Sequence, residues 1–447
     1  MSAASNIRKL LQSDLENSPN WELGLELIVG LKLEEQLLTD LFMFYDQNIA
    51  MQREEVNIVR RAWHLIPSRH HPELQHLLSS GLDRDYFPQP WQRYYEIALH
   101  PLLDPEVVKH WCKSGHRYAR YFFLLVARDE EFATLYPDPH RFRFIATPCN
   151  RVFPGLRNKR QLHELWLHDN LLTHLPEWMG EFSQLKIAHF SRNRLLRLPS
   201  TFGNLRRLET LHLSENRFPE IPPPLRELPN LQELHYAHNA VPDTTEFARF
   251  PPSLTRLVLL GNQLNDVTDI GHLIHLRELN LRDNQLERVP WAVVGLPALE
   301  ALDLAKNPLK EIPAVFREMR LRQLDLSETE VESLPGILPA TLEHLRLGGT
   351  ETSTWENEFV RLPALQHLGL SGCELEQLPA SLRHCSQLAE LDVSENPALH
   401  LPAWLPELSA LRTIDLTGCE EVQEWEVIRP LWERGVEFIG GNQYWER

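Results

Sequence analysis

Leucine recurs at a fixed interval through the C-terminal two thirds of the 447-residue chain. The apolar positions follow the pattern Leu-x-x-Leu-x-Leu-x-x-Asn, and successive units start 23 residues apart, with local intervals of 22 and 21. A repeat of roughly 20 to 50 residues predicts a solenoid, in which each unit buries its apolar side only against its neighbours. The twelve clear units start at Leu162, Leu185, Leu208, Leu231, Leu254, Leu276, Leu299, Leu321, Leu342, Leu365, Leu388 and Leu411.

The first half of each unit predicts a short β-strand. In LETLHLSEN, Leu211 and Leu213 alternate with polar residues, so the leucines face inward while Thr210, His212 and Ser214 face outward. One period before Leu162, the stretch PHRFRFIAT has the same alternation and forms a degenerate first repeat, with Phe142 and Phe144 in the core positions. Thirteen such strands at a spacing of about 4.8 Å predict a curved parallel sheet on the order of 60 Å long.

In most units an asparagine follows the predicted strand at the same position of the repeat, and these residues are here called the asparagine column. A buried amide can bridge adjacent coils and satisfy backbone groups that would otherwise lack partners. Because Cys373 and Cys419 occupy this column, we interpret them as small buried polar substitutes and not as nucleophiles or metal ligands. The column reads Asn170, Asn193, Asn216, Asn239, Asn262, Asn284, Asn307 and Asn396, with Thr147, Thr329, Thr350, Cys373 and Cys419 in the remaining units.

The second half of most units contains Leu-Pro or a close variant. Proline is acceptable there because this return arm donates few ladder hydrogen bonds and can begin a helical turn. The step is lost at Thr244-Thr245, Val267-Thr268 and Trp355-Glu356, where we expect the local curvature to change. The steps that are present are Leu175-Pro176, Leu198-Pro199, Ile221-Pro222, Val289-Pro290, Ile312-Pro313, Leu334-Pro335, Leu378-Pro379 and Leu401-Pro402.

These units resemble the leucine-rich-repeat family, specifically the short intracellular and bacterial type with LxxLxLxxNxLxxLPxxLxxL, and the resemblance covers roughly residues 139–442. It implies an α/β solenoid: a horseshoe with a parallel β-sheet on its concave face, used for protein recognition. It also implies a bacterial protein.

Different patterns flank the repeats. The segments WELGLELIVGL, EEQLLTDLFMFY and DPEVVKHWC carry apolar residues at helical spacing, which predicts an all-α domain or cap over residues 1–138. The solenoid then spans 139–425 with about thirteen repeats, and 426–447 form a C-terminal cap with a last strand in VEFIGGN. Caps protect open solenoid ends. Whether the helical domain is only a cap or also a second binding domain stays open.

The charge distribution narrows the class of partner. The formal net charge is −17, which argues against a nucleic-acid binder because affinity for phosphate requires neutralising cations. Residues 1–138 hold 14 Lys/Arg and 20 Asp/Glu, residues 139–298 hold 19 and 16, and residues 299–447 hold 12 and 26, so the regional nets are −6, +3 and −14. The acidic end suits a protein partner with a basic surface, although the same acidity also keeps a long solenoid soluble.

Cysteine usage and apolar runs point to a cytoplasmic protein. The five cysteines are odd in number and form no CxxC pair, the start has no apolar signal segment, and no apolar run is long enough to span a bilayer. We therefore expect no membrane partner, while an injected effector would look the same. The sequence does not specify an oligomeric state.

The sequence contains none of the common catalytic or nucleotide-binding motifs. Walker, GxGxxG, HExxH and GxSxG motifs are absent, so we expect neither catalytic residues nor a cofactor. The chain is therefore predicted not to be an enzyme.

The outward column at the centre of the strands contains the candidate binding residues. His189, His212 and His235 fall on consecutive strands, where their rings should stack at about the strand spacing. Three interpretations stay open: a mixed polar and aromatic recognition strip, a pH-sensitive contact surface, or a zinc site, against which the strand spacing argues. The predicted partner-binding residues are Arg143, Trp166, His168, His189, His212, His235, His238, Asp303, Asp325, Arg346, Asp392 and Asp415.

Three functions follow from this column. The first is a protein-interaction module in which Trp166 and the histidines form one anchor while the aspartates receive Lys or Arg from the partner. The second is an adaptor or effector that presents a target to a separate enzyme through its helical domain. The third is a metal-dependent hydrolase that uses the three histidines. We expect the first.

Overall fold

The structure is a computed structural model that describes residues 138–146, 149, 152–239, 244–332, 334, 336–350 and 359–440. The chain divides into two units, residues 1–160 with 167–173 and residues 161–166 with 174–447. The helical domain expected over 1–138 lies outside the described residues apart from Asp138, as does the interruption at Trp355-Glu356.

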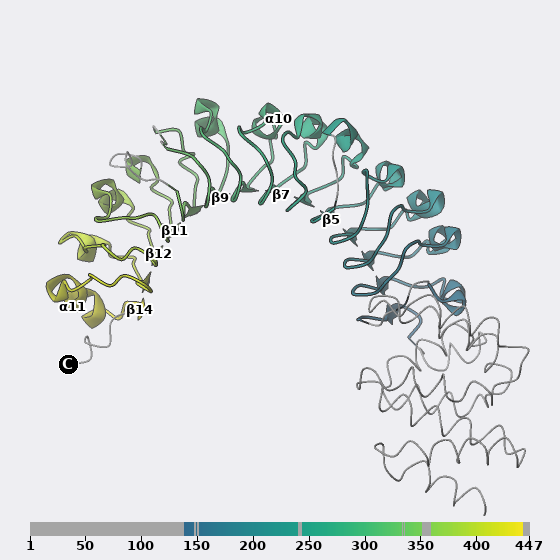
Figure 1. Ribbon diagram of the computed structural model, residues 1–447, viewed down its shortest axis with the longest axis horizontal. Coiled ribbons are helices and arrows are strands. Elements are labelled where there is room, and N and C mark those ends of the chain that lie inside the picture. Colours follow the sequence, from purple (N-terminus) through teal and green to yellow (C-terminus); the bar gives the residue numbers. More distant parts are fainter. Residues whose placement is uncertain are drawn as a thin grey trace, which may run out of the picture. The chain divides into compact units, whose positions relative to one another are not determined.

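The second unit is built on a parallel sheet of three-residue strands that follow one another in sequence order. Figure 1 shows that this unit curves, with the strands along its inner side and the helical turns along its outer side. The strands are β2 (Glu164–Trp166), β3 (Ile187–His189), β4 (Thr210–His212), β5 (Glu233–His235), β6 (Arg256–Val258), β7 (Glu278–Asn280), β8 (Ala301–Asp303), β9 (Gln323–Asp325), β10 (His344–Arg346), β11 (His367–Gly369), β12 (Glu390–Asp392), β13 (Thr413–Asp415) and β14 (Glu437–Ile439).

The described part of the first unit contains β1 (Arg141–Arg143), where the degenerate repeat was predicted. Phe142 and Phe144 are buried with exposed fractions of 1% and 3%, so they fill the two core positions as expected. The amide of Asn170 donates to the Phe144 carbonyl oxygen at 2.8 Å and to the Leu167 carbonyl oxygen at 2.9 Å, which is the predicted bridge between coils.

Short helical turns form the return arms. Pro176, Pro199, Pro290 and Pro313 each precede a turn, with φ between −72° and −63°. The turns are η4 (Pro154–Asn158) in the first unit and η5 (Glu177–Glu181), η6 (Ser200–Asn204), η7 (Pro223–Glu227), η8 (Thr244–Arg249), η9 (Thr268–His272), α10 (Trp291–Val294), η10 (Ala314–Glu318), η12 (Ala380–His384), η13 (Leu405–Glu407) and α11 (Trp425–Glu433) in the second.

Two repeats that lack the Leu-Pro step still form a turn, η8 at Thr244 and η9 at Thr268. Val267 is fully buried before η9, so it fills the apolar position without a proline. Loss of the proline therefore does not remove the return helix.

The core lies between the sheet and these turns. Leu211 and Leu213 of one coil are fully buried, and so are Leu234 of the next coil and Phe202 on the return side. Burial of each such side chain contributes roughly 1.5–3 kcal/mol, and the contribution depends on the neighbouring coil.

The asparagine column crosses the core as a ladder. Asn262 is 1% exposed, and its amide donates to the carbonyl oxygens of Tyr236 in the preceding coil and Leu259 in its own, both at 2.9 Å. Its Oδ1 accepts the backbone N–H of Asn239 at 2.9 Å. The interpretation as a buried substitute agrees with the structure for Cys373, whose Sγ lies 3.3 Å from the Leu347 carbonyl oxygen and whose pKa is raised by burial. Cys419 makes the equivalent contact, 3.0 Å from the Val393 carbonyl oxygen, but is only half-buried.

The residue before each ladder position adopts the left-handed conformation, a feature that the sequence analysis missed. Arg192, Glu215, Asp283 and Lys306 all have φ between 54° and 56°. This turn directs the chain out of the sheet and brings the ladder residue into the core.

Candidate functional site

Most of the predicted binding residues occupy equivalent positions on successive strands. Nine of them are the third residue of a strand in the second unit, where the side chain points away from the buried leucines: Trp166, His189, His212, His235, Asp303, Asp325, Arg346, Asp392 and Asp415. Arg143 holds the same position in β1 of the first unit. His168 lies beyond β2 in the first unit, and His238 is an exposed left-handed residue beyond β5, so neither belongs to this column.

The first four of these side chains form a continuous row of rings, here called the ring strip: Trp166, His189, His212 and His235. Successive ring centroids lie 5.1, 4.4 and 4.2 Å apart across β2 to β5. All four side chains are half-buried. The predicted stacking therefore exists.

Glu233 supports the end of the ring strip. Its Oε1 lies 2.6 Å from Nε2 of His235, and Arg256 lies 3.6 Å from the same oxygen. Burial alone would favour the neutral acid, but the hydrogen bond from His235 and the neighbouring charges hold the pKa of Glu233 below its ordinary value.

The alternative of a metal centre gains no support from this geometry. Among the residues that the structure describes, no group of three or more His, Cys, Asp or Glu side chains is arranged to hold a metal ion. The rings are stacked at the strand spacing and do not converge on one point.

The aspartates of the column have a structural role that the sequence analysis missed. In each case Oδ1 accepts the backbone N–H two residues further on: Ala305 at 3.1 Å for Asp303, Ser327 at 2.9 Å for Asp325, Ser394 at 3.0 Å for Asp392 and Thr417 at 2.9 Å for Asp415. This is an Asx turn, for which a short polar side chain at the end of a strand is the sequence signal. These hydrogen bonds therefore fix the orientation of the four aspartate side chains on the sheet.

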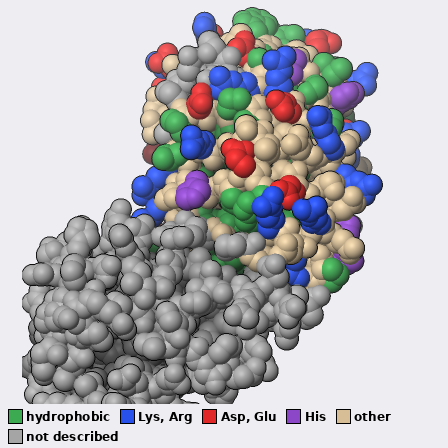
Figure 2. Space-filling model, turned by 90° about the vertical axis from the view of Figure 1, so that its right-hand side faces the viewer, with side chains coloured by type: hydrophobic (Ala, Val, Ile, Leu, Met, Phe, Trp, Pro, Cys, Tyr) green, Lys and Arg blue, Asp and Glu red, His purple; other side chains and the backbone are tan. Residues whose placement is uncertain are grey.

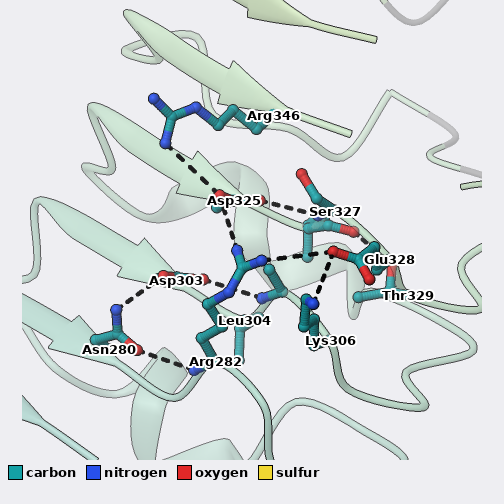
Figure 3. Close-up of polar contacts among 12 residues, drawn as sticks. Asn280, Arg282, Asp303, Leu304, Lys306, Asp325, Ser327, Glu328, Thr329 and Arg346 are labelled. Atoms are coloured by element: carbon teal, nitrogen blue, oxygen red, sulfur yellow. Dashed lines mark hydrogen bonds and ion pairs between the residues drawn. The ribbon is translucent and has the colours of Figure 1, made fainter. Parts of the chain in front are cut away.

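The second carboxylate oxygens of Asp303 and Asp325 lie near polar side chains of other coils. Figure 3 shows Asn280 donating to Oδ2 of Asp303 at 2.8 Å, while Oδ2 of Asp325 lies 3.9 Å from Arg282 Nη1 and 3.8 Å from Arg346 Nη1. Arg282 also lies 3.5 Å from Glu328. Asp325 is thus between two guanidinium groups, at distances too long for a hydrogen bond.

A shallow groove of about 250 Å³ lies over β6 to β10, and Asp303, Asp325 and Arg346 are among the residues that line it. Ala301 aligns with Glu278 on one side and Gln323 on the other, and its short side chain leaves the hollow between them. Burial, with a smaller contribution from the Asp325 charge, raises the pKa of Asp303 despite the hydrogen bond from Ala305.

The sequence analysis also missed the first outward position of each strand. There, His344 stacks on His367 with ring centroids 4.1 Å apart, and His367 Nδ1 lies 2.7 Å from Glu390 Oε2. Burial and the adjacent His367 lower the pKa of His344. Alternation within each strand indicates two outward positions, the first and the third residue, and the predicted column is the third residue alone.

Ion pairs connect neighbouring coils elsewhere in the second unit. Lys186 pairs with Glu209 at 2.9 Å, and Arg322 pairs with Glu343 at 2.8 Å. In the face that Figure 2 presents, basic and acidic side chains are likewise interspersed. Over the described residues, neither Asp392 nor Asp415 takes part in an ion pair of this kind, and both side chains are half-buried.

The described helices have nine residues or fewer. None of those in the described ranges is long and apolar enough to cross a bilayer.

Comparison with solved structures identifies the same architecture. A leucine-rich-repeat protein from Leptospira interrogans has 25% sequence identity and a TM-score of 0.55, with 68% of this chain and 84% of that chain covered. An internalin from Listeria monocytogenes has 21% identity and a TM-score of 0.57, with 71% and 90% covered, and shows the fold alone.

Sequence comparison agrees with the structural one. Models of the leucine-rich-repeat family match residues 207–228, 252–309 and 274–331. The TMV resistance protein N of Nicotiana glutinosa is 35% identical over 71 residues, which are 15% of this chain and 6% of that protein. The chain thus spans only a small part of that relative. Through its repeats, the chain belongs to the leucine-rich-repeat family.

Proposed function

We propose that the chain binds a protein partner through the concave face of the second unit and has no catalytic role of its own. The observation that carries this proposal is the ring strip, a row of four half-buried rings on consecutive strands of the concave sheet face. Aromatic side chains surrounded by polar ones are the usual composition of an interface hot spot. The fold is one that generally mediates protein–protein interaction.

The concave face offers two kinds of contact to such a partner. Over β3 and β4 the outward strand positions are Ile187, His189, Thr210 and His212, which carry no Lys, Arg, Asp or Glu. Over β8 to β13 the outward positions include four of the predicted aspartates. A partner with an apolar or aromatic patch next to a basic surface would match both parts.

The test compares two doubly substituted proteins in affinity capture from cells that express the chain. His212→Glu with Arg346→Glu alters the concave face, and His384→Glu with Arg317→Glu makes the same chemical change on exposed residues of the outer turns η12 and η10. We expect the concave variant to lose the partner and the outer variant to keep it. Equal capture by both folded variants would contradict the proposal.

A cytoplasmic location belongs to the same proposal. The described cysteines Cys149, Cys373, Cys385 and Cys419 are all free thiols, as expected in a reducing compartment. The adaptor hypothesis depends on residues 1–137, which lie outside the described residues, and no observation on the concave face favours it.

A further inference from the structure

We propose that the groove over β6 to β10 is the anchor site for one Lys or Arg side chain of the protein partner, which enters above Ala301 and places its cation between Asp303 and Asp325. This inference rests on the proposed function, because it assigns the chemistry of one contact on the concave face. Its three supports are the shape of the groove, the unused acceptor on its floor and the sign of the surrounding charge.

The shape fits a single extended side chain. The groove has a volume of about 250 Å³. Ala301 on β8 lines it with a short side chain and lies between Glu278 and Gln323 of the neighbouring strands. A lysine or arginine buries its aliphatic stem along apolar surface while the cation remains among polar groups. Ala301, which lines the groove, provides an apolar methyl group for that stem.

The floor of the groove has an acceptor in position for the cation. Asp303 and Asp325 are paired in register on β8 and β9, so their carboxylates lie about one strand spacing apart. Asp325 is 14% exposed, and among the described residues its Oδ2 accepts no hydrogen bond, since Arg282 and Arg346 remain at 3.9 and 3.8 Å. A closer donor can therefore bind this oxygen without displacing an existing hydrogen bond.

The two arginines beside Asp325 do not complete the site. Arg282 is shared with Glu328, to which Lys306 also pairs at 3.4 Å, and Arg346 is 75% exposed (Figure 3). Arg256 at the other end of the groove lies 3.6 Å from Glu233 and 3.3 Å from Glu278. Arg256 and Arg282 are therefore already paired with other carboxylates, while Arg346 extends toward solvent and stays 3.8 Å from Asp325. Asp303 has an amide, Asn280, as its outward partner.

Burial makes Asp303 more sensitive to a cation than an exposed carboxylate is. Its charged form loses hydration and lies beside a like charge, which raises its pKa. A cation that enters the groove relieves both costs, so binding and ionisation of Asp303 favour each other.

The test titrates the full-length protein, labelled with carbon-13 at the aspartate carboxyl groups, with single-residue probes. Nα-acetyl-arginine amide and Nα-acetyl-lysine amide are the cationic probes, and the corresponding citrulline and norleucine amides are their neutral counterparts. We expect saturable shifts of the Asp303 and Asp325 carboxyl resonances with the cationic probes alone. Absence of these shifts, or equal shifts with the neutral probes, would overturn the proposal.

Two matched variants make the assignment specific. Asp303→Asn keeps an oxygen for the Ala305 N–H and should weaken cation binding about tenfold, as expected for loss of one charge-assisted contact. Asp269→Asn removes the same charge from the exposed outer turn η9 and should leave binding unchanged. Equal effects of both variants would show that the probes sense only the net charge. If the wild-type protein does not bind the cationic probes but still captures its partner through the concave face, the groove assignment is refuted and the proposed function stands.

Discussion

In most coils a single asparagine satisfies backbone groups of two coils, which makes it a sensitive position at the residue scale. The amide of Asn284 donates to the carbonyl oxygens of Leu259 at 3.1 Å and Leu281 at 2.9 Å, and its Oδ1 accepts the N–H groups of Asn262 at 3.1 Å and Leu264 at 3.0 Å. The exchange of such a residue leaves several buried polar groups without partners.

We predict that Asn262→Ala lowers the free energy of unfolding by about 3 kcal/mol, because at least one buried donor and two buried acceptors lose their partner. Asn265→Ala, an exposed residue of the same coil, is the control and should have little effect. Urea denaturation followed by circular dichroism measures both. Similar midpoints for the two variants would show that the ladder does not hold the coils together.

The raised pKa of Asp303 gives a second prediction at this scale. The pKa of Asp303 in the folded protein lies above the value of about 3.9 in an unfolded chain. As pH rises from the unfolded to the folded pKa, the unfolded chain releases this proton first, so the free energy of unfolding decreases. Relative to wild type, Asp303→Asn should therefore gain stability between pH 4 and pH 7, and Asp269→Asn should show no such trend. Thermal unfolding at the two pH values provides the measurement, and parallel curves for all three proteins would contradict the assignment.

The packing of neighbouring return turns governs stability at the scale of elements. A Cβ built on Gly180 in η5 would lie 2.2 Å from the Thr201 carbonyl oxygen in η6, which is backbone and cannot move aside easily. Gly271 holds the same place in η9, and a Cβ there would meet nothing within 4 Å. Glycine is thus required at one turn and only tolerated at the other.

We predict that Gly180→Ala destabilises the protein by about 1–3 kcal/mol, as overpacking of a close contact does. Gly271→Ala should be neutral or slightly stabilising, because it reduces the entropy of the unfolded chain without a clash. Differential scanning calorimetry of the two variants distinguishes them. A Gly180→Ala protein as stable as wild type would show that η5 and η6 can separate at little cost.

At the scale of the whole molecule, the features that most coils share were predictable from the sequence. Periodicity located the strands, the buried leucines and the asparagine ladder, because stacking forces each coil to repeat the same solution. The stack of His344 on His367 was missed, since it depends on which side chain of the next coil a ring reaches. The Asx turns of Asp392 and Asp415 lie within one coil, and their signal, a short polar side chain at the end of a strand, is equally compatible with a freely exposed carboxylate. The groove depends on the small size of Ala301 between two longer neighbours, which only the register reveals.

Partner recognition is also a property of the whole molecule, because the concave face gathers side chains that are far apart in the sequence. His212 on β4 and Gln323 on β9 both face outward from the sheet, although 111 positions separate them along the chain (323 − 212). A partner that binds this face must contact several coils at once, so its affinity should depend on the integrity of the solenoid.

Site-specific photocross-linking tests the concave-face claim most directly. A benzophenone amino acid replaces His212 or Gln323 on the concave face, or Trp291, which is 74% exposed at the start of α10 on the outer side. We predict that the same partner protein is cross-linked from both concave positions and not from Trp291. Cross-linking from Trp291 alone would place the partner on the outer side of the coils and contradict recognition through the concave sheet.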